Sequence, residues 1–286
     1  MGWRRRADSG LIWKLKVAAA RLTVTPMTRQ AHLTELFSSI QGEGPYVGVR
    51  QLFVRFYGCH RRCVFCDSPE TVTAWQPAGF KPPTYQMEQT PGRRDFAAVP
   101  NPVDADHLLA QFARFDTPHG KHHSIAFTGG EPLLYADFLR GLLPRVREAG
   151  WMSYLETAGD LYHELEKILP WLDICAMDIK LPSVTQNEAA WGSHRQFLGR
   201  CIGQGVATYV KTIVSAETTD DDLDAAVKLV ADLAAETPFV IQPMTPFGDA
   251  RNGPRTDQLM RWQERAGDHL HDVRIIPQCH KMMGAL

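Results

Sequence analysis

Short apolar runs and amphipathic segments follow one another along most of the chain. The apolar runs have the length and composition of buried strands. They span residues 51–57, 124–128, 152–156, 174–179, 207–214, 238–242 and 273–276. Between them, spacing and composition predict helices over residues 104–115, 135–148, 161–169, 193–204, 219–235 and 257–269. Strands that alternate with helices pair in parallel, so the sequence predicts an α/β fold, either an open doubly wound sheet or a full or partial (β/α) barrel.

Three stretches depart from this alternation. Residues 33–48 end in a glycine- and proline-containing run and predict a short helix or turn. Residues 74–103 are rich in proline, glycine and polar residues, which predicts a long loop of functional or mobile character. Residues 1–29 carry many basic residues against a single acid, and Lys14 and Lys16 interrupt the apolar run that a secretory signal needs. We therefore predict a non-core extension over 1–29 and one domain over 30–286.

Polar and glycine-rich residues gather where the predicted strands end. They include Cys59, Thr128-Gly-Gly-Glu-Pro132, Glu156-Thr157-Ala158-Gly159, Asp178-Ile-Lys180, Gln242-Pro-Met-Thr245 and Gln278-Cys-His-Lys281. Parallel barrels build their sites from the carboxyl ends of their strands, whereas the rest of each strand is apolar filling. This distribution favours the barrel over the open sheet.

Three cysteines at C-x3-C-x2-C spacing, Cys59, Cys63 and Cys66, follow the first of these strands. A cubane iron–sulfur cluster normally takes four protein sulfurs, so three thiolates leave one iron open to another ligand. A structural zinc site needs four closed ligands, and His60, adjacent to Cys59, is badly placed to be the fourth. A disulfide framework and buried unreactive thiols are further alternatives. Ligand count and spacing favour the cluster.

The cysteine spacing, with Phe65 before the last cysteine, resembles the signature of the radical S-adenosylmethionine (SAM) superfamily. The run that begins at Thr128 resembles that superfamily's GGEP motif, whose two glycines let backbone approach a ligand. The resemblance implies a partial TIM-like barrel of about six parallel strands and a [4Fe–4S] cluster whose open iron is chelated by SAM. Reduction would then cleave SAM to methionine and a 5′-deoxyadenosyl radical. It also implies that Gly130 and Glu131 contact SAM, and Thr128 SAM or substrate.

A longer series of motifs narrows the resemblance to one family. The motifs are Ile40-Gln-Gly-Glu-Gly-Pro, Arg55, Cys-x3-Cys-x2-Cys-Asp-Ser, Asp178-Ile-Lys180-Leu-Pro, Gln242-Pro-Met and Gln278-x-His-Lys. Over residues 33–286 they closely resemble 7-carboxy-7-deazaguanine synthase. The resemblance implies conversion of 6-carboxy-5,6,7,8-tetrahydropterin to 7-carboxy-7-deazaguanine and ammonia, with SAM, a [4Fe–4S] cluster and Mg²⁺. The radical would take hydrogen from carbon 6 of the pterin, the ring would contract, and SAM would be re-formed.

The resemblance also implies a set of pterin-binding residues. Arg55, on an apolar strand, would form a bidentate pair with the substrate carboxylate, unless it makes a structural ion pair instead. The segment 41–43 would read the hydrogen-bonding edge of the pterin, unless it is only a glycine turn. The expected substrate-binding residues are Ile40, Gln41, Gly42, Glu43, Arg55, Thr128, Gln278, His280 and Leu286.

A second implied set binds SAM and a metal ion. The expected SAM-binding residues are Phe65, Asp67, Gly130, Glu131, Thr157, Asp178, Lys180, Gln242 and Thr245. Ser68 stands where the family offers a hydroxyl, commonly of threonine, to Mg²⁺. Magnesium takes few protein ligands, so one hydroxyl suffices, although a serine before Pro69 can equally be only a turn former.

Composition sets bounds on partners and compartment. The 286 residues are 44% hydrophobic and 22% charged, with a net charge of −1, so nothing global favours nucleic acid or an anionic membrane as a partner. No apolar run reaches the roughly 18 residues of a membrane span. Six cysteines, three of them scattered, suit a reducing cytoplasm better than a disulfide scaffold. We expect a cytoplasmic homodimer that takes electrons from a donor such as flavodoxin or ferredoxin.

Two rival functions stay open at this point. A glycyl-radical activating enzyme shares the cysteine spacing and GGEP but acts on a protein partner, which the loop at 74–103 could serve. A zinc-stabilised interaction module would use the cysteines structurally. Binding assays distinguish the two enzymes: a 7-carboxy-7-deazaguanine synthase binds the carboxypterin, whereas a glycyl-radical activating enzyme binds a partner protein. Iron with acid-labile sulfide excludes the zinc module.

Overall fold

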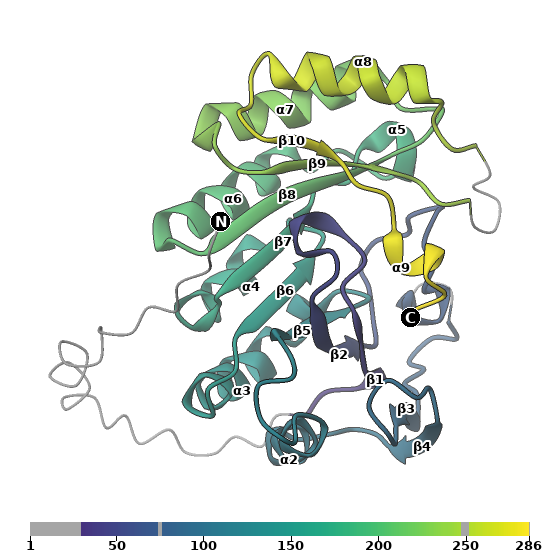
Figure 1. Cartoon of the computed structure of the whole chain (residues 1–286), viewed down its shortest axis with the longest axis vertical. Helices are drawn as coiled ribbons and strands as arrows, with labels where there is room; N and C mark the ends of the chain where they lie inside the picture. The colour runs from purple at the N-terminus through teal and green to yellow at the C-terminus, as the bar shows by residue number, and fades with distance from the viewer. Residues whose placement is uncertain (1–29, 74–75, 247–251, 286) are drawn as a thin grey trace, which may run out of the picture.

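One curved sheet organises the structure (Figure 1). The computed structural model describes residues 30–73, 76–246 and 252–285, so the basic extension predicted for 1–29 lies outside the described residues. The sheet has ten strands in the order β10-β9-β8-β7-β6-β5-β2-β1-β3-β4. The strands are β1 Leu33–Ile40, β2 Arg50–Phe56, β3 Thr84–Glu88, β4 Phe96–Pro100, β5 Ser124–Gly129, β6 Ser153–Thr157, β7 Ile174–Asp178, β8 Ala207–Val214, β9 Phe239–Pro243 and β10 Val273–Ile275.

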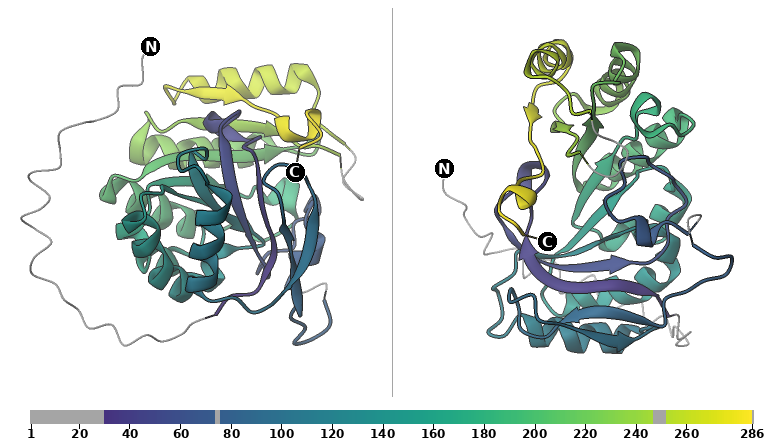
Figure 2. Two further views of the ribbon diagram at one scale, coloured as in Figure 1. Left: turned by 60° about the horizontal axis from the view of Figure 1, so that its bottom comes forward. Right: turned by 90° about the vertical axis from the view of Figure 1, so that its right-hand side faces the viewer.

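The parallel part of the sheet forms a partial barrel. All neighbours from β2 through β5, β6, β7, β8 and β9 to β10 pair in parallel. Helices lie on the outer, convex side of this part, as Figures 1 and 2 show for α3, α4, α6 and α7. The predicted partial barrel of about six parallel strands is confirmed, with one more strand in the parallel series.

The helices follow the predicted pattern closely. The α-helices are α2 Ala105–Phe115, α3 Ala136–Glu148, α4 Tyr162–Glu166, α5 Pro182–Thr185, α6 Trp191–Gln204, α7 Asp220–Ala234, α8 Thr256–Gly267 and α9 Cys279–Met282. The short 3-10 helices are η2 Gly44–Tyr46, η3 Pro69–Thr71, η5 Pro132–Tyr135 and η6 Leu169–Trp171. The helix predicted over 161–169 ends early, at Glu166, because Pro170 has no N–H to donate to the Glu166 carbonyl. Among the described residues, no helix is both long and apolar enough to cross a membrane.

Residues 33–48 form a strand followed by a tight turn, so the short helix or turn predicted there is wrong over its first half. β1 pairs antiparallel with β2. A register shift between Leu33 and Glu35 interrupts the two-residue alternation of side chains. Because of this irregularity, residues 33–40 lack the strict alternation of apolar and polar residues by which a strand is recognised in a sequence.

Residues 74–103 contain a β-hairpin, so the predicted long loop is also wrong. β3 pairs antiparallel with β4 and parallel with β1, which extends the sheet beyond the barrel. Tyr85 and Met87 alternate into the core while Thr84 and Gln86 are exposed. The two strands are short, and the prolines and glycines that flank them dominated the sequence signal.

The inner face of the sheet carries an apolar layer with a polar layer above it. Side chains on one face of a strand recur every two residues. The apolar layer consists of Phe37, Phe53, Ala126, Tyr154, Ile174, Ala176, Tyr209 and Val240, with Tyr46 packed against it. Two residues further along six of these strands lie Arg55, Thr128, Glu156, Asp178, Lys211 and Gln242. The apolar layer therefore closes the barrel below a rim of polar groups.

Gly44 brings the turn after β1 against the ring of Tyr209. Its φ is +64°, and a Cβ there would lie 2.4 Å from the tyrosine ring. Gly48, at φ +94°, has open space around it. We expect Gly44→Ala and Gly48→Ala each to lose about 1–2 kcal/mol of unfolding free energy to backbone strain, and Gly44→Ala a further ~1–3 kcal/mol to the clash. Urea unfolding measures both; equal losses would contradict the close packing.

Candidate active site

A cavity of about 440 Å³ opens at the carboxyl ends of the parallel strands. It brings together predicted residues from segments that are far apart in the sequence. These are Ile40, Gln41, Gly42, Glu43, Arg55, Cys59, Cys63, Phe65, Cys66, Asp67, Ser68, Thr128, Gly130, Thr157, Asp178, Lys180, Gln242, Thr245, Gln278 and His280. Of the other predicted site residues, Glu131 does not line the cavity, and Leu286 lies outside the described residues.

The three cysteines of the C-x3-C-x2-C spacing lie in the loop after β2 and line one cavity. All three are free thiols, so the disulfide alternative is wrong. The Cys66 amide donates to the Cys63 carbonyl at 3.0 Å, and the Arg61 amide donates to Cys59 Sγ at 3.4 Å. Burial raises the pKa of Cys66 to about 11 and also raises that of Cys63. A metal that binds these sulfurs must therefore displace protons.

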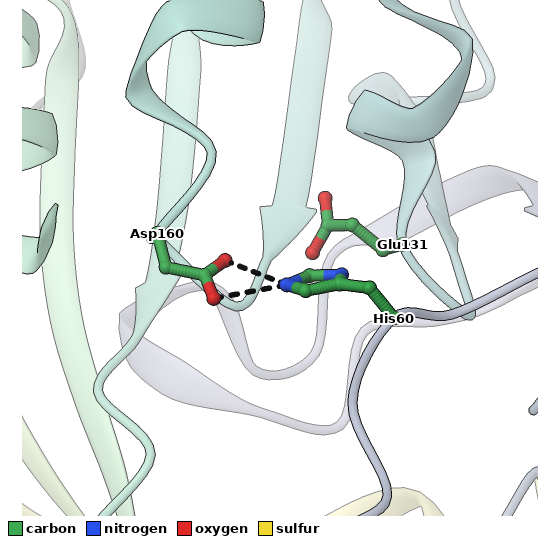
Figure 3. Close-up of side chains that lie close together, drawn as sticks. All are labelled: His60, Glu131 and Asp160. Atoms are coloured by element: carbon green, nitrogen blue, oxygen red, sulfur yellow. Dashed lines mark hydrogen bonds and ion pairs between the residues drawn. The ribbon is translucent and has the colours of Figure 1, made fainter. Parts of the chain in front are cut away.

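Next to the cysteine loop, His60, Glu131 and Asp160 bring potential ligand atoms within 4.8 Å of one another (Figure 3). Asp160 already accepts hydrogen bonds from His60 Nε2 and Arg61 Nε, each at 2.9 Å. Burial opposes a charge on the ring, but the hydrogen bond to Asp160 raises the pKa of His60 to about 10. We interpret the group as a charge cluster that ties the cysteine loop to the loop after β6.

Glu131 joins two strand ends instead of facing the cavity. Its carboxylate is fully buried and accepts hydrogen bonds from Thr157 Oγ1 at 2.8 Å and the Ala158 amide at 2.9 Å. Its neighbour Gly130 packs backbone against backbone, since a Cβ there would lie 2.1 Å from the Gly58 carbonyl oxygen. The glycine-rich run after β5 thus supports the cysteine loop directly.

Charged side chains of alternating sign lie at the base of the cavity. Lys211 Nζ lies 2.7 Å from Glu43 Oε2 and 2.9 Å from Asp178 Oδ2, and Lys180 Nζ lies 2.8 Å from Asp178 Oδ2. Burial pushes the pKa of Asp178 and of Glu43 up. Lys180 and Lys211 more than offset this for Asp178, and Lys211 with Gln278 and His280 does so for Glu43, so the pKa of each carboxyl is lowered. Both carboxylates are therefore ionised near neutral pH.

Two buried acceptors in this region have no partner among the described residues: Asp178 Oδ1 and Gln242 Oε1. Leaving a buried acceptor unsatisfied costs roughly 1–3 kcal/mol, so native structures usually pair such atoms. Both residues line the cavity. A ligand with hydroxyl or N–H donors fits these two atoms.

Gln41 lines the cavity, but its amide group is already engaged by the protein. Its Nε2 donates to Gln51 Oε1 and to Glu156 Oε1, both at 2.8 Å, and its Oε1 accepts from the Glu43 amide at 2.9 Å. Gln41 therefore orients Glu156, a cavity-lining carboxylate, and also fixes the turn that carries Glu43.

Arg55 makes the structural ion pair that was its alternative interpretation and still lines the cavity. Its Nε lies 2.7 Å from Glu35 Oε2, and its Nη1 donates to Ser68 Oγ at 3.3 Å. The Arg55 side chain remains 20% exposed. Because a guanidinium carries five N–H donors in a planar fork, Arg55 can serve Glu35 and a ligand together.

The C-terminal segment runs from β10 to α9 (Figure 1) and lines one side of the cavity with Gln278, His280 and Lys281. The Cys279 amide donates to the Gly42 carbonyl at 2.8 Å, and Lys281 Nζ lies 2.8 Å from Asp67 Oδ2. A Cβ on Gly42 would lie 2.2 Å from His280 Nδ1. The glycine thus lets the terminal segment pack against the turn after β1.

The sequence analysis assigned no binding role to several residues that line the cavity, among them Arg61, Glu156, Lys211 and Lys281. Two of these carried a signal. Glu156 and Lys211 stand on apolar strands, as Arg55 does, and the same two-residue periodicity that singled out Arg55 selects them as well.

A family model described as the Radical SAM superfamily matches residues 53–185, the part of the chain that contains the cysteine loop and the GGEP run. The crystal structure of QueE from Escherichia coli shares the fold, with a TM-score of 0.56 over 88% of this chain and 95% of that chain, at 21% identity. The three free thiols at the mouth of the partial barrel therefore lie in a segment that matches the radical SAM superfamily, within a fold that the QueE structure shares.

Relatives of similar length narrow the assignment. The chain is 40% identical over 257 residues to the 7-carboxy-7-deazaguanine synthase of Geobacter sulfurreducens, covering 90% of this chain and 98% of that protein. It is 33% identical over 273 residues to the 7-carboxy-7-deazaguanine synthase of Methanothermobacter thermautotrophicus, covering 89% of this chain and 98% of that protein. The chain belongs to the 7-carboxy-7-deazaguanine synthase family.

The charge cluster beside the cysteine loop makes stability depend on pH. The pKa of His60 is about 10 in the folded protein against an ordinary value of 6.5. Its contribution is therefore complete below about pH 6.5 and is lost as the pH rises through about 10. His60→Gln keeps an N–H donor for Asp160 but cannot titrate. Urea unfolding should show a steeper loss of stability from pH 6.5 to 10 in the unaltered protein; parallel curves would contradict a protonated His60.

Proposed function

We propose that this enzyme converts 6-carboxy-5,6,7,8-tetrahydropterin into 7-carboxy-7-deazaguanine and ammonia. The observation that carries the proposal is one cavity lined by three free thiols, Arg55 and several carboxylates, in a chain 40% identical to a 7-carboxy-7-deazaguanine synthase. A substrate carboxylate can pair with Arg55, and a substrate edge rich in N–H groups can donate to the carboxylates that line the cavity. Residues 74–103 contain a β-hairpin and not the predicted long loop that could serve a protein substrate.

Cys59, Cys63 and Cys66 would hold a [4Fe–4S] cluster and leave one iron for SAM. The donor set fits, because thiolates are the ligands that iron–sulfur clusters prefer and three of them lie in one short loop. When bound, the cluster and SAM supply the 5′-deoxyadenosyl radical. The protein keeps the loop in place through Asp160, which holds His60 and Arg61.

SAM would bind to groups whose hydrogen-bonding capacity is still open. The buried acceptors Asp178 Oδ1 and Gln242 Oε1 suit the ribose hydroxyls of SAM. Lys180, whose Nζ lies 5.5 Å from the centroid of the Phe65 ring, would offer its charge to the SAM carboxylate. The remaining proposed contacts are Asp67, Gly130, Thr157 and Thr245, with Glu131 contributing through its backbone.

The pterin would bind between Arg55 and the carboxylates of Glu43 and Glu156. Arg55 would receive the substrate carboxylate, which is attached to the carbon that loses hydrogen, and so would set the position of that carbon. The two glutamates would accept hydrogen bonds from the N–H groups of the pterin, and Gln41 would orient Glu156. The other proposed substrate contacts are Ile40, Gly42, Thr128, Gln278, His280 and Leu286.

Ser68 would offer its hydroxyl oxygen to Mg²⁺. This oxygen already accepts one hydrogen bond, from Arg55 Nη1 at 3.3 Å, and a hydroxyl has a second lone pair for a metal. Magnesium keeps most of its coordination sphere as water and ligand oxygens, so the substrate carboxylate beside Arg55 would complete the site.

We also propose a homodimer in the cytoplasm that receives electrons from flavodoxin or ferredoxin. The support is the family membership and the six free cysteines, which suit a reducing compartment. On the cysteine loop, His60 and Arg62 are exposed and basic, and such groups favour an acidic electron donor.

The test of the function is anaerobic incubation of the reconstituted holoenzyme with SAM, a reductant, Mg²⁺ and 6-carboxytetrahydropterin. Mass spectrometry should find 7-carboxy-7-deazaguanine, with little net consumption of SAM. Formation of 5′-deoxyadenosine alone would reject this substrate while keeping radical SAM chemistry.

Arg55→Lys tests the proposed contact with the substrate carboxylate. Lysine keeps the charge but loses the planar fork, so kcat/KM for the pterin should fall about 10- to 100-fold, as expected for one charge-assisted hydrogen bond. The dissociation constant for SAM should not change. Arg50→Lys is the matched control, because Arg50 lies on the same strand and bonds Ser38. An equal loss in both variants would point to a structural role instead.

A further inference from the structure

Lys211 stands between two carboxylates that come from different parts of the fold. It lies on β8, and its side chain is only 11% exposed. Across the sheet its register partner is Asp178 on β7. On the other side it meets Glu43, which the tight turn after β1 carries into the barrel. An ammonium has three N–H donors, so one lysine can bond both carboxylates without competition.

The two carboxylates do not depend on Lys211 equally. Asp178 has a second cation, because Lys180 Nζ lies 2.8 Å from the same oxygen, Oδ2. Glu43 has one ammonium partner, Lys211; Gln242 and Gln278 donate to its Oε1 at 3.1 and 2.8 Å, and His280 adds a smaller electrostatic effect. A buried carboxylate without a charged partner is strongly disfavoured. Lys211 is therefore the main support for the charge of Glu43 and one of two supports for Asp178.

We propose that Lys211 is a positioning residue that serves both ligand half-sites, as the shared counter-ion of Glu43 on the pterin side and Asp178 on the SAM side. The proposal rests on the proposed function, which assigns these two carboxylates to the two ligands. Lys211 itself touches neither ligand in this account. It holds the carboxylates ionised and in place, so that each can accept hydrogen bonds from its ligand.

The arrangement separates Lys211 from Lys180 in an experiment. Lys211→Met should weaken the binding of both ligands, because both carboxylates lose a charged partner. Lys180→Met should weaken SAM only, because Lys180 does not contact Glu43. We expect each affected dissociation constant to rise by at least about tenfold, in line with the loss of one charge-assisted hydrogen bond. Lys211→Arg, which keeps a charge with several donors, should recover part of both losses.

The measurements use the reconstituted holoenzyme under anaerobic conditions. SAM binding is followed by the change it causes in the electron paramagnetic resonance signal of the reduced cluster, and pterin binding by its KM under saturating SAM. Glu43→Gln and the double variant Glu43→Gln with Lys211→Met complete a cycle. Since a neutral Glu43→Gln side chain no longer needs a counter-ion, the double variant should bind pterin better than the two separate losses predict.

Each outcome decides the proposal. The proposal would be overturned if Lys211→Met weakened the binding of one ligand only. Strictly additive losses of pterin binding in the cycle would overturn it as well. Unchanged binding of both ligands in folded, iron-replete Lys211→Met would do the same. If Lys211→Met does not fold, the proposal is tested by ligand binding to Lys211→Arg and to the double variant Glu43→Gln with Lys211→Met. Failure of the unaltered enzyme to turn over the pterin would instead reject the proposed function, while the SAM measurements would still show whether Lys211 supports Asp178.

Discussion

The two-residue periodicity of the parallel strands is the constraint on which the site depends. Neighbouring strands in register present their inner-face residues at the same height, so an apolar layer is followed by a polar layer at the carboxyl end. Tyr209 and Lys211 illustrate the step on a single strand: the tyrosine packs in the apolar layer, and the lysine two positions later enters the cavity. A slip of one residue would exchange the two faces and empty the site.

The polar layer is stable because its charges are paired inside the protein. Isolated charges at this depth would cost several kcal/mol each in desolvation. Here Glu43 and Asp178 each lie beside a lysine, and Glu156 accepts a hydrogen bond from Gln41. The exceptions are Asp178 Oδ1 and Gln242 Oε1, for which the described residues provide no donor. Donors of a bound ligand would satisfy both atoms, which is why we propose them as SAM contacts.

The first part of the cysteine loop is held by backbone packing and by an ion-pair cluster. On one side, Gly130 allows backbone to lie directly on Gly58, just before Cys59. On the other, Asp160 bonds both His60 and Arg61. These contacts hold residues 58–61, the first part of the loop, in place before any metal arrives, which lowers the ordering cost of cluster binding. The GGEP run thus has a structural task beside any contact with SAM.

The sequence by itself determined the order of strands and helices, the cysteine spacing and most of the residues that line the cavity, because periodicity and residue chemistry are local properties. It did not reveal β1 or the hairpin β3–β4, since a register shift and flanking prolines obscured their alternation. Nor did it show that the carboxylate of Glu131 points away from the cavity, that the Gln41 amide donates a hydrogen bond to Glu156, or that Lys211 pairs with two carboxylates. Only the tertiary structure decided these points, because the partner of a buried polar group is chosen by strand register and packing between residues far apart in the chain.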